Sequence, residues 1–233
     1  MIKLIRTEWM KLRTFCLVLP VIAAFLLLGV TSGFWYINFR EAPGGVYSTM
    51  SVMYFFLSFT LMLSATLLSS VIASTEHETK GWNRACSLPV GKSKIYISKW
   101  IVTCMLLLAE VLVIIAGTFV LWKLMFHEPA PLEILIKQPL YCFLAGFAFL
   151  SIQMWLSTVF ANQSIAISAG TAGSMASLFL ARSTFPVLQY MPWTYPALST
   201  PLVPGHWHWI VAGLAVGVVL LAAGCWHFTR KDW

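Results

Sequence analysis

Residues 15–37 read FCLVLPVIAAFLLLGVTSGFWYI, a stretch of 23 residues without Asp, Glu, Lys or Arg. A helix needs about 20 mostly apolar residues to cross the roughly 30 Å hydrocarbon core of a bilayer, so this stretch is long enough to span one. It is also too long for the apolar region of a signal peptide, and no convincing small-x-small cleavage site precedes the polar loop that follows. We therefore expect Phe15–Ile37 to be a retained transmembrane helix.

The same pattern recurs along the rest of the chain. Five more apolar blocks of similar length follow, and among all six blocks Glu110 is the one charged residue. The 233 residues are 59% hydrophobic and 10% charged, against about 25% charged in ordinary soluble domains. The sequence thus predicts one all-α membrane domain over residues 1–233, with spans at Phe15–Ile37, Met50–Ser74, Trp100–Trp122, Leu140–Ala161, Ser164–Ala181 and Trp209–Phe228.

The distribution of basic residues predicts the orientation of these spans. Of the 15 Lys and Arg residues, 11 lie in the N-terminal segment, the loop after the second span and the C-terminal end, which leaves four on the other side. Short cytoplasmic loops carry the excess of Lys and Arg in membrane proteins. Both termini are therefore expected in the cytoplasm, and the net charge of +7 reflects topology rather than nucleic-acid binding.

Two cytoplasmic segments have a recognisable local pattern. In residues 1–14 the apolar side chains of Ile2, Ile5 and Trp9 recur at helical spacing between basic residues, which predicts an amphipathic helix on the inner membrane surface. The loop of residues 75–99 opens with Thr75-Glu76-His77-Glu78, the pattern of a capping box. A short, separate helix is expected to begin there.

The segment between the fifth and sixth spans is unusual. Residues 182–205 contain five prolines and several aromatic residues, so the segment is too apolar for a free loop and too broken by proline for a span. Backbone of this kind at membrane depth must be covered by protein or line a cavity. We expect short interfacial or re-entrant helices on the outer face.

The sequence contains few residues that could catalyse a reaction or bind a metal. Val90-Gly91-Lys92-Ser93 resembles the end of a phosphate-binding P-loop, but position 86, where the first glycine belongs, is Cys86. The five cysteines are scattered and offer no disulfide framework or paired metal motif. No catalytic residue, no metal site and no cofactor bound by this chain is expected.

Glu110 is the residue within the spans with the clearest functional potential. An acid at the bilayer centre costs about 2.5–3.5 kcal/mol, an amount that the apolar residues around it outweigh. Such a residue faces the interior of the helix bundle. A role in substrate recognition or coupling and a structural hydrogen bond both remain open. The possible substrate path consists of Glu110 with the outer aromatic residues Phe185, Tyr190, Trp193 and Tyr195.

Three stretches resemble the motifs of a known family. Residues 5–13, IRTEWMKLR, look like an amphipathic E-x-x-K-L-(K/R) segment, and residues 228–232, FTRKD, look like a closing F-x-x-(K/R)-D. Residues 76–99 are similar to the pattern E-x-x-x-G-T-W-x-x-L-x-x-x-P-V-S-R-x-x-x-x-x-x-K, with Gly81-Trp82 and Gly91-Lys92 as departures. The chain thus resembles the membrane subunits of bacterial type 2 ABC exporters, particularly the small permeases of lantibiotic immunity and peptide-antibiotic resistance.

The resemblance implies a coupling helix over residues 76–88 that docks on a separate ATPase subunit, which binds ATP and Mg²⁺. It implies two permeases, identical or paralogous, in the bacterial cell membrane, and a cationic amphiphilic peptide as cargo. The expected ATPase-coupling residues are Glu76, His77, Glu78, Lys80, Gly81, Trp82, Asn83 and Arg84.

Three other functions remain open at this point. The protein could be an ABC permease for another cargo, such as a lipid, a glycan precursor, an ion or a drug. It could instead sense a peptide without moving it. A secondary transporter comes third, because such folds usually contain internal repeats and several intramembrane polar residues, and no repeat is visible in this sequence.

Overall fold

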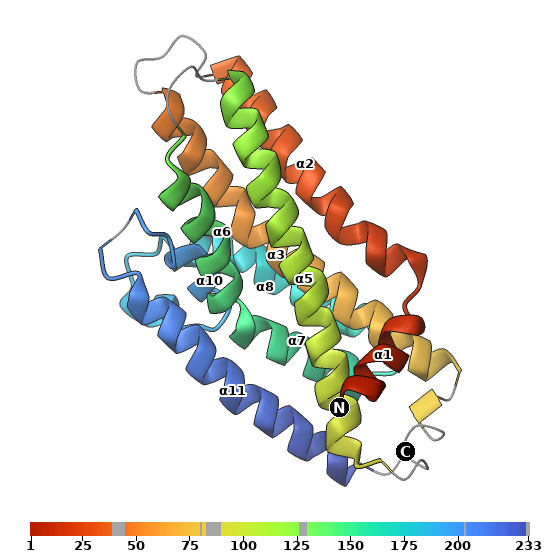
Figure 1. The fold of residues 1–233 in the computed structure, drawn as a ribbon. Helices are drawn as coiled ribbons and strands as arrows, with labels where there is room; N and C mark the ends of the chain where they lie inside the picture. The colour runs from red at the N-terminus through yellow and green to blue at the C-terminus, as the bar shows by residue number, and fades with distance from the viewer. Residues whose placement is uncertain (39–44, 80, 83–89, 126–129, 203, 232–233) are drawn as a thin grey trace.

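The structure, a computed structural model, describes residues 1–38, 45–79, 81–82, 90–125, 130–202 and 204–231, and of residues 45–50 it describes the backbone. The described residues form an elongated helical bundle (Figure 1). Its helices are α1 (Ile2–Met10), α2 (Thr14–Asn38), α3 (Gly45–Glu78), α5 (Lys92–Met125), α6 (Leu132–Ala145), α7 (Phe147–Val159), α8 (Gln163–Leu180), α9 (Pro186–Gln189), α10 (Tyr195–Leu198) and α11 (Trp207–Arg230).

By length and composition, several of the described helices can cross a membrane. Four pass this test separately: α2, α3 from Ser51 onward, α5 and α11. Large apolar side chains remain exposed on their outer faces, for example Leu26 at 64% and Val219 at 66%. Exposed apolar faces on helices of this length are expected where the surrounding solvent is hydrocarbon.

The fourth predicted span, Leu140–Ala161, differs from what is observed. The chain is already helical from Leu132, and it bends by 42° at the break between α6 and α7. The break falls at Gly146, a poor helix former, whose N–H donates to the carbonyls of both Cys142 and Phe143. The pair counts as a fifth candidate span only if α6 and α7 cross the membrane together.

The fifth predicted span, Ser164–Ala181, is observed as the helix α8, but it is not among the four or five candidate spans of the described chain. Its sequence, QSIAISAGTAGSMASLFL, has hydroxyls and glycines where the other spans have leucines, which lowers its apolar character. The all-helical class is confirmed for the described residues. Six spans remain a prediction.

Helix α11 lies very close to the α6–α7 pair at Gly217. A Cβ atom at Gly217 would lie 2.9 Å from the backbone carbonyl carbon of Phe147. Real Cβ atoms do not come this close to other heavy atoms, so the contact requires glycine. The Ser151 hydroxyl donates to the Gly217 carbonyl at 3.0 Å across the same contact. Small residues that bring backbones together are typical of helix packing in membranes.

The segment between α8 and α11 contains the two short helices that were expected. Both α9 and α10 carry proline in the first turn, where its missing N–H costs nothing. The Tyr195 hydroxyl donates to the Tyr190 carbonyl at 2.7 Å, which ties the two helices together. Whether they lie at an interface or re-enter the membrane remains a prediction.

Candidate functional site

Segments far apart in the sequence meet at the end of the bundle that holds the N-terminus (Figure 1). The helix α1 lies there beside the end of α3, the start of α5 and the end of α11. They contain the described residues of the three motif-bearing stretches of the sequence, at residues 5–13, 76–99 and 228–232. The side chains that they bring together form the candidate site.

The centre of the site is a group of four charged side chains, which we call the ion cluster: Glu8, Lys11, Glu76 and Lys99. The Lys99 Nζ lies 2.6 Å from Glu8 Oε2 and 2.9 Å from Glu76 Oε1. The Lys11 Nζ lies 3.2 Å from Glu8 Oε1 and 3.1 Å from Glu76 Oε1. Each lysine therefore bridges both carboxylates, and the formal charges of the cluster cancel.

Burial makes the ion cluster sensitive to the loss of Lys99, Glu8 or Glu76. The Lys99 side chain is 2% exposed, and those of Glu8 and Glu76 are 7% exposed. Removing one partner from a buried ion pair costs about 3–5 kcal/mol, because it leaves an uncompensated charge. Partial burial would by itself lower the pKa of Lys11, but the two carboxylates outweigh it and raise that pKa above its ordinary value.

An aromatic group adjoins the ion cluster. The Trp82 ring contacts those of Phe228 and His77, with centroids 5.1 and 5.6 Å apart. The Lys99 Nζ lies 5.4 Å from the Trp82 ring centroid, within the range of a cation–π interaction. Trp82 thus joins the segment after α3 to both α5 and α11.

The absence of a side chain at Gly81 lets the backbone pass close to Glu76. A Cβ at Gly81 would lie 2.0 Å from Glu76 Oε2, so any larger residue displaces that carboxylate or the backbone. Since Glu76 binds both lysines, a side chain at position 81 would also disturb the ion cluster. The glycine of the sequence motif is therefore required by close packing.

The predicted capping box at Thr75 is wrong. Helix α3 continues unbroken to Glu78, and the Thr75 hydroxyl donates backward to the Ile72 carbonyl at 2.8 Å. Glu78 is exposed and lies 2.6 Å from Arg13 Nη2. The reason is that Glu76 and Glu78 are held by ion pairs with Lys11, Lys99 and Arg13. These pairs favour continuation of α3 through residues 75–78, so no new helix starts there.

The structure thus divides the predicted coupling residues into two groups. One group is buried and anchors the loop to the helices: Glu76, Gly81 and Trp82. Glu78 is exposed and His77 is half-buried, with Nε2 3.3 Å from the Ser157 carbonyl oxygen. Lys80, Asn83 and Arg84 lie outside the described residues.

Three members of the ion cluster were not singled out from the sequence: Glu8, Lys11 and Lys99. All three occupy charged positions of the motif stretches, as the Glu and Lys of E-x-x-K-L and as the last Lys of the loop pattern. Their place at charged positions of the motifs was the signal in the sequence that could have identified them. Buried ion pairing then links residues 91 positions apart.

The possible substrate path is not one continuous surface in the described part of the chain. Glu110 is fully buried and its Oε1 accepts from the Ser64 hydroxyl at 2.9 Å. Phe185 and Tyr190 are exposed, at 69% and 67%, whereas Tyr195 is buried. Trp193 packs against the apolar core formed by α2, α3, α5 and α7. The acid and the outer aromatic residues are therefore separate features.

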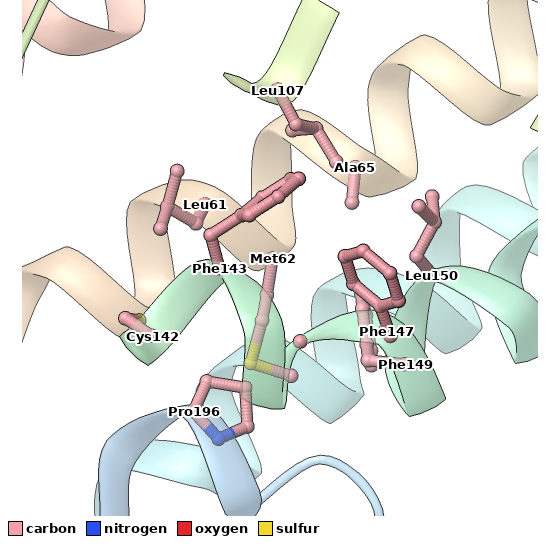
Figure 2. Close-up of a pocket in the computed structure, with 11 residues that line it drawn as sticks. Leu61, Met62, Ala65, Leu107, Cys142, Phe143, Phe147, Phe149, Leu150 and Pro196 are labelled. Atoms are coloured by element: carbon pink, nitrogen blue, oxygen red, sulfur yellow. The ribbon is translucent and has the colours of Figure 1, made fainter. Parts of the chain in front are cut away.

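A small cavity beside the α6–α7 bend marks the interior of the bundle (Figure 2). Phe143, Phe147 and Pro196 surround it, and its volume is about 20 Å³. That is room for about one water molecule, in an apolar environment. A peptide could not pass through this cavity without a rearrangement of the helices.

The comparison with protein families identifies the class of this chain. A family described as "ABC-2 family transporter protein" matches residues 4–177, which is more than half of the sequence. The matched stretch contains all four members of the ion cluster. No curated protein matches the chain. Together with the candidate spans of the helical bundle, the family match shows that this is a multi-pass membrane protein and that the chain belongs to the ABC-2 transporter family.

Proposed function

We propose that this chain is the permease subunit of an ATP-driven exporter, with ATP and Mg²⁺ bound by a separate ATPase subunit. The observation that carries the proposal is the ion cluster: four paired charges, three of them buried, at the base of the loop whose sequence resembles a coupling helix. No cofactor is assigned to the permease itself. Two permeases, identical or paralogous, complete the transporter.

The proposed orientation puts both termini and the ion cluster in the cytoplasm, and six spans cross the membrane. The 11 basic residues counted for this side include Lys11, Arg13 and Lys99, all at the cluster end of the bundle. An ATPase in the cytoplasm would then meet the exposed Glu78–Arg13 edge and the loop that follows it.

The ion cluster suggests how a movement of the loop reaches the spans. Lys99 lies in the buried part of α5, Glu76 is the last buried residue of α3, and Glu8 belongs to α1. Because each lysine binds both carboxylates, the three helices move together or the buried pairs break. A displacement of the loop by the ATPase is thus transmitted to α3 and α5 as a unit.

The cargo that we propose is a cationic amphiphilic peptide of the lantibiotic type, expelled from the membrane to confer immunity or resistance. The support is the resemblance of the motif stretches to immunity permeases. The exposed rings of Phe185 and Tyr190 add apolar surface on the outer side, and the Tyr190 hydroxyl adds a polar tip. This combination suits a peptide at the membrane interface.

The test is reconstitution in liposomes with the partner ATPase subunit. Addition of a lantibiotic to the lumenal or outer leaflet should raise ATP hydrolysis, and ATP should move a fluorescent derivative of the peptide across the membrane. Peptide binding without ATP-dependent movement would favour a sensor. Movement without ATP would overturn the exporter assignment.

A further inference from the structure

A long apolar groove follows the seam between α2 and α3. It has a volume of about 460 Å³, within the roughly 300–1,000 Å³ usual for ligand sites. Two lining residues, Thr60 and Ser64, are polar, and the Ser64 hydroxyl is already engaged with Glu110. The groove is lined by Phe15, Leu19, Ile22, Ala23, Leu26, Leu27, Val30, Phe56, Phe59, Thr60, Leu63, Ser64 and Leu67.

A second cavity continues the groove toward the end of the bundle away from the termini. Its volume is about 340 Å³, and it shares Phe56 with the first cavity. Phe34, one turn beyond Val30 on α2, and Arg182, just after α8, also line it. We call the first cavity the stem and the second the mouth of the groove.

The mouth contains a positioned cation. The guanidinium carbon of Arg182 lies 4.4 Å from the centroid of the Phe55 ring, and Nη1 donates to the Leu178 carbonyl at 2.9 Å. Within the described residues no carboxylate pairs with Arg182. By contrast, Lys137 of α6 forms an ion pair with Glu133 on its own helix. Arg182 is exposed and lines the mouth, so it is accessible to a ligand there.

The stem lies at membrane depth and is open along α2. The side chains of Ile22 and Leu26 line it and are still 52% and 64% exposed. From Phe15 to Val30 the stem follows α2 for about 22 Å at 1.5 Å per residue. The hydrocarbon core of one leaflet is about 15 Å thick, so the stem is long enough for one acyl chain.

We propose that this groove binds an anionic phospholipid, with an acyl chain along the stem and the phosphate at Arg182. An arginine binds phosphate in a bidentate manner, which a lysine does not. The ring of Phe55 and the Leu178 carbonyl hold the guanidinium in place, and apolar burial holds the chain. In the proposed orientation the lipid belongs to the outer leaflet. The proposal goes beyond the exporter function and holds whatever the cargo is.

The experiment compares lipid retention by the purified transporter complex in native mass spectrometry. Micelles are doped with dioleoyl phosphatidylglycerol or with dioleoyl phosphatidylcholine, which have the same acyl chains. The wild type should retain phosphatidylglycerol preferentially. Arg182→Gln should weaken that retention about tenfold, the effect of losing one charge-assisted contact, and should abolish the preference. Lys123→Gln is the matched control, because Lys123 also lies over a ring, that of Phe119, but away from the groove.

A second pair of variants tests the stem. Ala23→Trp fills the groove and should weaken retention of both lipids, whereas Ala222→Trp, on the exposed face of α11, should leave both unchanged. Equal retention of the two lipids by the wild type, or an unchanged preference in Arg182→Gln, would overturn the proposal. If Ala23→Trp splits a permease dimer and leaves lipid retention intact, the groove is covered by a second copy instead.

Discussion

The two ends of this bundle hold their charges in opposite ways. At the end near the termini, Glu8, Lys11, Glu76 and Lys99 are paired with one another, three of them in the interior. At the far end, Arg182 and Lys123 each lie on a phenylalanine ring, at 4.4 and 4.6 Å. The ion cluster of the near end is thus built of mutually dependent contacts, while Arg182 and Lys123 are each supported by a single ring.

This difference indicates at which end the removal of a charge costs more stability. Removing a charge from the ion cluster leaves a buried partner uncompensated. Removing Arg182 or Lys123 only uncovers one face of a phenylalanine ring and leaves no unpaired charge. The near end therefore suits transmission of movement, which needs helices that keep their relative positions.

The largest effect is expected from Lys99→Met, which breaks the ion cluster. Glu8 and Glu76 then share Lys11 alone, and we expect the free energy of unfolding to fall by about 3 kcal/mol or more. The measurement is denaturant unfolding of the purified protein in detergent. Lys94→Met, at an exposed position of the same helix, is the control. Equal stability of the two variants would mean that the cluster is not buried as described.

Gly81→Ala tests the same end through packing rather than charge. The added Cβ would lie 2.0 Å from Glu76 Oε2, and overpacking of this kind costs about 1–3 kcal/mol. The matched control is Gly91→Ala, because a Cβ there meets nothing within 4 Å. A loss of stability in the control as large as that in Gly81→Ala would point to glycine flexibility in the loop.

The sequence predicted the helices well because apolar blocks of fixed length report the surrounding hydrocarbon directly. It predicted the boundaries of α3 poorly, since Thr75 has a capping pattern that tertiary ion pairs override. The bend at Gly146 was also missed, as it depends on how α11 packs against α6 and α7. Glu76 was identified as a coupling residue, but its buried partners on α1 and α5 could not be paired without the fold.

A third, intermediate effect is expected at Glu110, which lies between the two ends. Glu110→Gln keeps an acceptor for the Ser64 hydroxyl, which donates to Oε1 at 2.9 Å, so stability should change by less than about 0.5 kcal/mol. Glu110→Leu leaves that hydroxyl unpaired and should cost about 1–2 kcal/mol. Unfolding in detergent measures both, and protection against the peptide is scored beside it. Lost protection in Glu110→Gln at unchanged stability would assign the carboxylate to cargo recognition.

The smallest effect on stability, and the most informative, is expected from Glu78→Ala. The ion pair with Arg13 is about half exposed on both sides, at 51% and 57%, and such pairs contribute less than about 1 kcal/mol. A docking surface for an ATPase must be accessible, and Glu78 is the accessible acid beside the ion cluster. Glu78→Ala should therefore leave the unfolding midpoint unchanged and lower peptide-stimulated ATP hydrolysis by the reconstituted complex.

Arg13→Ala removes the same ion pair from the other side. It therefore separates a role of the ion pair from a role of the Glu78 carboxylate itself. If both variants lower ATP hydrolysis equally, the pair acts by holding α1 against α3. If Glu78→Ala alone does so, the carboxylate itself contacts the ATPase. Full activity of both would limit coupling to the buried cluster and the loop that it supports.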